Sequence, residues 1–173
     1  FFFFFRTGLG RFKNFRLSYY QLMMDLFFFC ARHNIDEILE LPDVKERVDL
    51  YFQYEEEFKE QLRKCTKVYN NLVIIDYRDE EIIYPGNRFM VYTLFPEQNI
   101  SIHIFYAKDK DKIVYSTGKS ITNKTSKTNI GELMLKYGGG GHENAGACQI
   151  YKEESEKVLK ELIEKINQDG WFF

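Results

Sequence analysis

The stretch NIGELMLKYGGGGHENAGACQIY, residues 129–151, places a helix pattern and a strand pattern on either side of four glycines. Asn129 followed by Glu132 is typical of a capping box at a helix N-terminus, and the apolar residues Ile130, Leu133 and Met134 predict a helix over 130–137. The glycines end this helix, and 147–151 then predicts a strand. A helix followed directly by a strand indicates an α/β domain.

Strand and helix patterns also alternate in the flanking sequence. Residues 72–77 form an apolar, β-branched run typical of a buried strand, and 87–95 predicts a short helix. Residues 99–106 alternate between apolar and polar side chains before a charged turn, so with 113–116 they predict a β-hairpin. Apolar residues at helical spacing over 158–166 predict a last helix. The expected fold class is α/β, with a mixed β-sheet flanked by helices.

The N-terminal third shows helical periodicity only. Ser18 and Gln21 resemble a capping box, Asp36 is a candidate cap for a short second helix, and 42–65 keeps one apolar stripe typical of a long amphipathic helix. We therefore expect an all-helical segment, a connector helix and an α/β domain. The expected bounds are residues 1–41, 42–66 and 67–170.

The composition limits the classes of function. The 173 residues are 45% apolar and 29% charged, which is typical of a globular chain. With 24 Lys and Arg against 26 Asp and Glu, the net charge is −2, so a polyanion site has to be local. No apolar run reaches the roughly 20 residues of a membrane span, so we expect no membrane partner. Cys30, Cys65 and Cys148 form no CxxC pair, which argues against a disulfide framework and favours a cytoplasmic location.

The glycine run is longer than a helix end requires, because one glycine suffices there. Successive glycines let a backbone approach a ligand closely, and successive exposed N–H groups bind anions. His142 follows directly and adds a further donor. We therefore predict an anion-binding loop over 138–142; the alternative is a flexible loop with an exposed histidine.

A second candidate segment is TGKSITNKTSKTN, residues 117–129, which is rich in Lys, Ser and Thr and contains no acid. Ammonium and hydroxyl groups suit phosphate oxygens, and Lys124 is expected to reach towards the glycine loop. The alternative is a solvated polar loop. Gly118-Lys119-Ser120 resembles the end of a P-loop, but Ile113 stands where the first glycine is required.

Other chemistry has weaker support. His33, His103 and His142 lie in different predicted elements, so the sequence predicts no metal site, and His103 is expected to be half-exposed on a strand. The cysteines occupy apolar stripes or a strand, which disfavours a cysteine nucleophile. A basic loop is formed by Arg6, Arg11, Lys13 and Arg16. The phenylalanine blocks at 1–5, 27–29 and 172–173 carry no functional prediction.

The run GGGGHENAGA resembles the glycine–histidine signature of the small domain that follows the catalytic domain in DHH phosphoesterases, which include RecJ-like exonucleases. Residues 84–104 and 124–142 look like the exopolyphosphatase-related branch, and RTGLGRF, residues 6–12, is similar to the last part of the catalytic domain. The resemblance implies that 1–41 is a remnant of the catalytic domain and that 67–170 is the DHH-associated substrate-binding domain.

The resemblance also implies a set of site residues. Those that match the substrate-binding signature are Gly139, Gly140, Gly141 and His142. Lys124 and Thr125 stand where family members have an arginine and a serine, so a bidentate guanidinium would be replaced by a point charge. The usual ending Ala-Ala-Gly appears here as Ala-Gly-Ala, residues 145–147.

In the family, an upstream domain with a DHH triplet holds two metal ions, usually manganese. This sequence has no DHH triplet, so the resemblance implies a substrate-binding half that contains no catalytic residue and no metal site. The first hypothesis is therefore part of a manganese-dependent phosphoesterase that hydrolyses phosphodiester or phosphate-ester bonds and is inactive alone. Its expected partners are a nucleotide, oligonucleotide or polyphosphate substrate and a second copy in a homodimer. The alternative is a stand-alone nucleotide- or RNA-binding module, because alanyl-tRNA synthetases end in a related domain.

Overall fold

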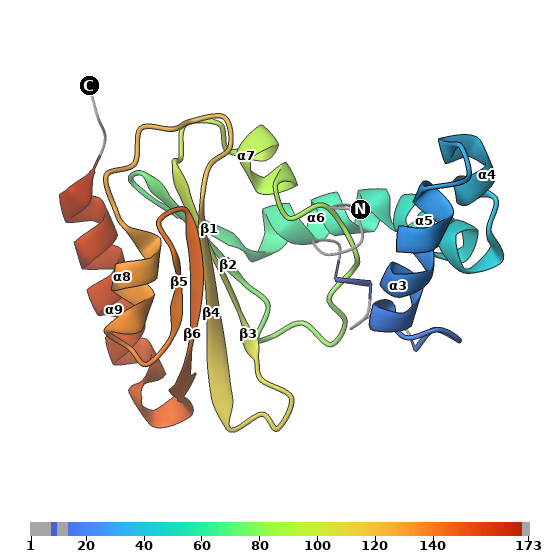
Figure 1. Ribbon diagram of the computed structural model, residues 1–173. Helices are drawn as coiled ribbons and strands as arrows, with labels where there is room; N and C mark the ends of the chain where they lie inside the picture. Colours follow the sequence, from blue (N-terminus) through green and yellow to red (C-terminus); the bar gives the residue numbers. More distant parts are fainter. Residues whose placement is uncertain (1–7, 10–13, 171–173) are drawn as a thin grey trace. The chain divides into compact units, whose positions relative to one another are not determined.

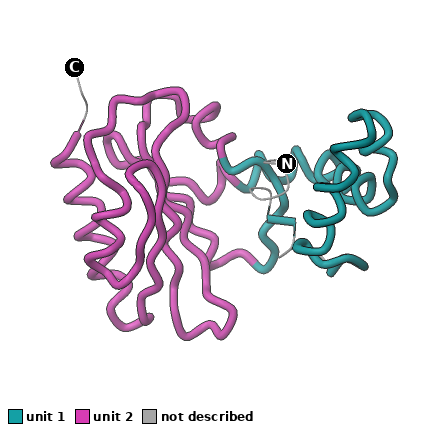
Figure 2. The backbone as a smooth tube through the Cα atoms, viewed as in Figure 1, with its two compact units in different colours: residues 1–61, 81–88 teal, residues 62–80, 89–173 magenta. Residues whose placement is uncertain are grey.

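The computed structural model describes residues 8–9 and 14–170 (Figure 1). The backbone divides into two compact units, residues 1–61 with 81–88, and residues 62–80 with 89–173 (Figure 2). Arg6, Arg11 and Lys13 of the predicted basic loop, and the phenylalanine blocks at 1–5 and 172–173, lie outside the described residues.

The first unit is helical, as predicted. Its helices are α3 (Tyr19–Cys30), α4 (Ile35–Leu39), α5 (Pro42–Gln53) and the first part of α6 (Glu55–Cys65). Ser18 caps α3, because its Oγ accepts the Gln21 N–H at 3.1 Å. The predicted cap of α4 is wrong: Asn34 and Glu37 form the capping box, and Asp36 lies in the first turn. The core of this unit gathers around buried Leu22 and Val44.

The predicted continuous helix over 42–65 is interrupted. Tyr54 separates α5 from α6 with φ −106° and ψ 17°, outside helical geometry. Three glutamates, Glu55, Glu56 and Glu57, then occupy the first turn of α6, where negative charge is favourable. The boundary between the two compact units falls inside α6, after residue 61. The three-part division at 41 and 66 stays a prediction.

The second unit contains a mixed six-stranded sheet, which confirms the expected class. The strand order is β1-β2-β3-β4-β6-β5, and only β2 and β3 pair in parallel. The strands are β1 (Thr66–Tyr69), β2 (Leu72–Asp76), β3 (Ile100–Tyr106), β4 (Lys112–Lys119), β5 (Gly140–His142) and β6 (Ala145–Tyr151). The hairpin β3–β4 is confirmed, whereas β1 and β5 are strands that the sequence patterns did not predict.

Three further helices lie in this unit: α7 (Met90–Leu94), α8 (Ile130–Leu135) and α9 (Lys152–Asp169). Figure 1 shows α8 and α9 on the same face of the sheet. Apolar side chains of β3, α8 and α9 form one buried cluster there, including Ile102, Met134 and Leu162, each with no exposed surface. The periodicity of 99–106 therefore placed the isoleucines on the correct face.

His103 was predicted to be half-exposed on a strand, and this prediction is wrong because the residue is buried. Its side chain lies on the face opposite the isoleucines, but only 7% of the residue is exposed. The ring stacks on Tyr77 with centroids 6.0 Å apart, and the neighbouring Ser101 shares a 2.7 Å hydrogen bond with Tyr92 of α7. Both faces of β3 are thus covered, which alternation alone does not reveal.

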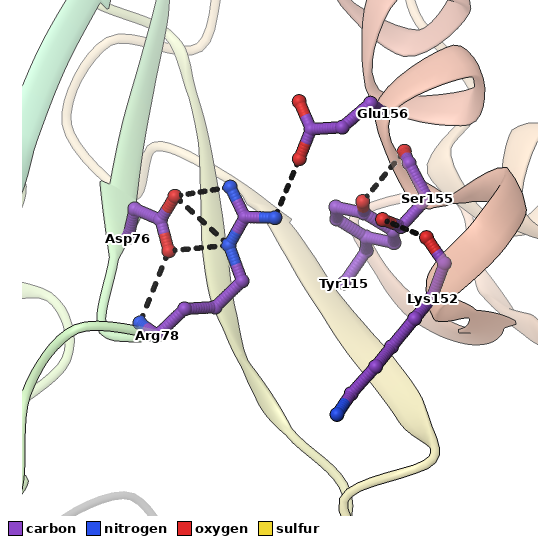
Figure 3. Close-up of polar contacts among 6 residues, drawn as sticks. All are labelled: Asp76, Arg78, Tyr115, Lys152, Ser155 and Glu156. Atoms are coloured by element: carbon purple, nitrogen blue, oxygen red, sulfur yellow. Dashed lines mark hydrogen bonds and ion pairs between the residues drawn. The ribbon is translucent and has the colours of Figure 1, made fainter.

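Arg78 joins the end of β2 to the start of α9 (Figure 3). Its guanidinium donates to both carboxylate oxygens of Asp76 and, at 2.5 Å, to Glu156. Beside it, the Tyr115 hydroxyl donates to the Ser155 carbonyl at 2.8 Å. Burial raises the pKa of Tyr115 to about 12, so this hydroxyl remains a donor at neutral pH.

Within the described part of the chain, the helices are too short or too polar to cross a membrane.

Candidate functional site

The glycine run forms a turn and an edge strand. Gly138 has φ 71° and ends α8, with its N–H donating to Leu135 O and the Gly139 N–H donating to Met134 O. These two N–H groups are therefore engaged within the helix end, and the predicted anion-binding loop stays a prediction for the rest of the run. Gly140 begins β5, which pairs with β6 and forms one edge of the sheet.

Two glycines of the run are required by packing. At Gly139, a Cβ would stand 2.6 Å from the Cβ of Cys148. At Gly141, φ is 156° and a Cβ would collide with the Ala145 carbonyl. Gly131 lets α8 approach β5 closely, because a Cβ added at Gly131 would lie 2.9 Å from the Gly141 carbonyl. The run therefore brings α8, β5 and β6 together at backbone distance.

Gly140 has no such packing role. No described heavy atom lies within 4 Å of the position a Cβ would take, and its φ lies outside the left-handed region. A glycine with neither a conformational nor a packing requirement is the position at which an external group could approach the backbone closely. This observation distinguishes Gly140 from its neighbours in the run.

A pocket of about 280 Å³ lies between the start of α8 and the β5–β6 turn. Its lining residues are Asn129, Gly131, Glu132, Leu135, Gly140, Gly141, His142 and Glu143. The structure thus brings three of the predicted site residues, Gly140, Gly141 and His142, to one pocket. Gly139 contacts β6 instead.

The His142 ring is held by its own turn. Its Nδ1 accepts the Asn144 N–H at 3.2 Å, and the residue is exposed. With Nδ1 as acceptor, the neutral ring carries its proton on Nε2, which leaves an N–H donor available to a ligand oxygen. The geometry therefore fits the predicted role of a donor beside the glycines.

Lys119 is the cation that the structure places beside this pocket, and the predicted site did not include it. It ends β4, its backbone N–H donates to Asn144 O at 2.8 Å, and its Nζ lies 3.4 Å from the Glu143 carboxylate. Only 11% of its side chain is exposed. The strand register, rather than any spacing in the loop, carries Lys119 to the turn.

Lys124 and Thr125 have different surroundings, and the described pocket lining includes neither residue. The Thr125 hydroxyl donates to Asn123 Oδ1 at 2.6 Å and accepts from Asn99 Nδ2 at 3.0 Å. Asn99 is fully buried and accepts from Asn71. The polar segment is thus anchored to a buried asparagine pair, while Lys124 is exposed. A substrate contact by Lys124 or Thr125 stays a prediction.

A metal centre needs several His, Cys, Asp or Glu side chains that converge on one point. Among the described residues, no three His, Cys, Asp or Glu side chains gather where they could hold a metal ion. The manganese that the resemblance implies for an upstream catalytic domain stays a prediction.

Comparison with protein families identifies residues 87–168 as a DHHA1 domain. This confirms the resemblance drawn from the glycine–histidine signature: the chain contains the C-terminal, DHH-associated type of domain. The matched residues include α7, α8, the glycine run and most of α9.

Among solved structures, the chain is similar to the pGpG-specific phosphodiesterase PggH from Vibrio cholerae, with 60% identity and a TM-score of 0.80. That match covers 95% of this chain and 56% of PggH, so the chain spans little more than half the length of this relative. An exopolyphosphatase-related protein from Bacteroides fragilis matches at 18% identity with a TM-score of 0.49, over 82% of this chain and 43% of that one. No curated protein matches the sequence. The family match and the likeness to PggH support a role related to the DHH-family phosphoesterases.

Proposed function

We propose that this chain binds and positions the phosphate-containing substrate of a two-metal phosphoesterase that hydrolyses phosphodiester or phosphate-ester bonds. The observation that carries the proposal is Gly140, whose missing side chain leaves open space in a pocket shared with His142. The 60% identity to a phosphodiesterase named for pGpG supports a nucleotide or short oligonucleotide as substrate.

His142, Lys119 and Gly140 each have a different role in substrate binding. The His142 Nε2–H donates to a phosphate oxygen, and Lys119 supplies the positive charge once its Glu143 partner moves aside. Gly140 lets the substrate approach the backbone. Charge-assisted hydrogen bonds of this kind contribute about 1.5–3 kcal/mol each. Together they hold the substrate in one orientation, which is how positioning lowers a reaction barrier.

We assign no chemical step to the described residues, because no three of their His, Cys, Asp or Glu side chains gather where they could hold a metal ion. Manganese is proposed for the portion of a PggH-like protein that has no counterpart in this chain. We therefore propose that the chain binds the substrate but does not hydrolyse it alone. The predicted homodimer stays a prediction that light scattering would test.

Two assays on the purified chain test this function. Calorimetric titration with pGpG should show binding that weakens in Lys119→Met more than in Lys124→Met, which removes an equal charge away from the pocket lining. Incubation of pGpG with the chain and Mn²⁺ should yield no GMP. Absence of pGpG binding contradicts the substrate-binding role, and GMP production contradicts the claim that the chain is inactive alone. Equal binding of unrelated RNA would favour the alternative, a stand-alone RNA-binding module.

A further inference from the structure

We propose that Glu132 determines base specificity in this pocket by accepting hydrogen bonds from the N1–H and N2–H groups of guanine. The proposal rests on the proposed function, because it assigns the base that the same pocket takes. It concerns a residue outside the glycine–histidine signature, in the first turn of α8.

The side chains that line the pocket favour a neutral base over a phosphate on the α8 side. Among the described residues that line the pocket, none is Lys or Arg, and two are the carboxylates Glu132 and Glu143. A phosphate against the α8 side would face the negative charge of Glu132, whereas a neutral base is not repelled by it. The donors for phosphate oxygens, His142 and Lys119, lie instead at the turn.

The α8 side also offers a surface for the flat face of a base. Leu135 lines the pocket with 66% of its surface exposed, and Gly131 and Gly140 contribute only backbone. A nucleobase has apolar faces and a polar edge, so it can lie against Leu135 and the glycines while its edge points to a polar side chain. Glu132 is the polar group that α8 contributes with acceptor oxygens only.

The Glu132 carboxylate is oriented before any ligand arrives. Its Oε1 accepts from Asn129 Nδ2 at 2.9 Å, while Asn129 Oδ1 accepts the Glu132 N–H at 3.2 Å. This reciprocal pair fixes the side chain and leaves the second oxygen and a lone pair of the first available. The Glu143 carboxylate is in a different position, because it faces Lys119.

Guanine matches such a carboxylate better than the other purines do. It presents two adjacent donors, N1–H and N2–H, to the two oxygens. Hypoxanthine, the base of inosine, keeps only N1–H, and adenine places the acceptor N1 opposite the carboxylate. A bidentate contact of this kind discriminates between bases by roughly 5- to 150-fold. We therefore expect affinities in the order pGpG, pIpI, pApA.

The test is calorimetric titration of the chain with pGpG, pIpI and pApA, for the wild type and Glu132→Gln. Gln keeps the size of the side chain and an oxygen for Asn129, but it places a donor group opposite guanine. The ratio of pGpG to pApA affinity should fall about tenfold or more in this variant. Glu164→Gln, which removes an equal charge from the exposed surface of α9, should keep the wild-type ratio.

The outcomes separate the two proposals. Equal wild-type affinities for the three dinucleotides, or an unchanged ratio in Glu132→Gln, overturn the role of Glu132 and leave the proposed function standing. Failure of the wild type to bind any of the three overturns both. Because the ratio is compared within one variant, a general loss of folded protein does not imitate a loss of base specificity.

Discussion

Lys119 Nζ lies 3.4 Å from Oε1 of Glu143, so the cation beside the pocket is already paired with a carboxylate from the pocket wall. The two partners are unequally exposed, with 11% of the Lys119 side chain and 71% of the Glu143 side chain accessible. The long contact and the exposure of Glu143 indicate a weak pair that a substrate phosphate can replace.

Removal of the Glu143 charge should therefore strengthen anion binding. Glu143→Gln is expected to bind pGpG about 1.4- to fivefold more tightly, because exposed ion pairs contribute about 0.2–1 kcal/mol. The gain should shrink as salt rises, since ions screen the Lys119 charge. Titrations at two salt concentrations, with Glu164→Gln as the charge-matched control, measure this effect. Unchanged or weaker binding in Glu143→Gln would show that Glu143 does not compete for Lys119.

The glycines of the run should respond differently to alanine. Gly141→Ala introduces a Cβ at φ 156° against the Ala145 carbonyl, so it should lower the free energy of unfolding by about 2 kcal/mol or more. Gly140→Ala meets open space and should leave the melting temperature unchanged, yet weaken pGpG binding. Thermal melts and titrations of the two variants check both parts. Destabilisation by Gly140→Ala, or its normal binding, would contradict the assignment of Gly140.

Arg78 should stabilise the second unit through its bond to Asp76 more than through its bond to Glu156. The Asp76 side chain is 31% exposed and the Glu156 side chain 64% exposed, and the hydrogen bonds that Arg78 donates to Asp76 are the main cause of the raised Arg78 pKa. Arg78→Gln should cost about 1–3 kcal/mol of unfolding free energy, and Glu156→Gln less than about 1 kcal/mol. Urea unfolding of both single variants decides this, and equal losses would argue against the ranking.

Thiol reactivity should follow burial. Burial raises the pKa of Cys148 to about 11, and burial with the nearby Glu80 charge raises that of Cys65 to about 11. Because the thiolate is the reactive form, little of it is present at either residue at pH 8. Iodoacetamide at pH 8 should therefore modify exposed Cys30 first, as mass spectrometry can follow, and all three thiols in urea. Rapid modification of native Cys148 would contradict its placement in the core.

The sequence patterns predicted the elements that carry side-chain periodicity. The alternation over 99–106 identified β3, and Asn129 with Leu133 and Met134 identified α8 and its buried face. In contrast, β5 consists of two glycines and a histidine, so it has no apolar alternation to detect. The break at Tyr54 was also missed, because the apolar stripe continues across it.

The sequence patterns predicted the part of the candidate site that lies in one continuous segment, but not the part that strand pairing brings to it. The glycine–histidine signature located Gly140, Gly141 and His142, which share the pocket. The position of Lys119 beside the pocket depends on the strand register, which composition does not encode: Gly118 pairs with Ala145, and this brings the next residue, Lys119, to the turn. Thr125 suggested a phosphate contact by its hydroxyl, but that hydroxyl is bonded to Asn99 and Asn123.

The central claim is that His142 holds a substrate phosphate beside Gly140. Isothermal titration of pGpG into the wild type and His142→Ala tests it most directly, with melting temperatures measured on the same samples. We expect binding at least about tenfold weaker in His142→Ala, since one charge-assisted hydrogen bond contributes about 1.5 kcal/mol or more. The melting temperature should stay the same, because the exposed ring packs little. Equal affinity of the two proteins for pGpG would contradict the claim.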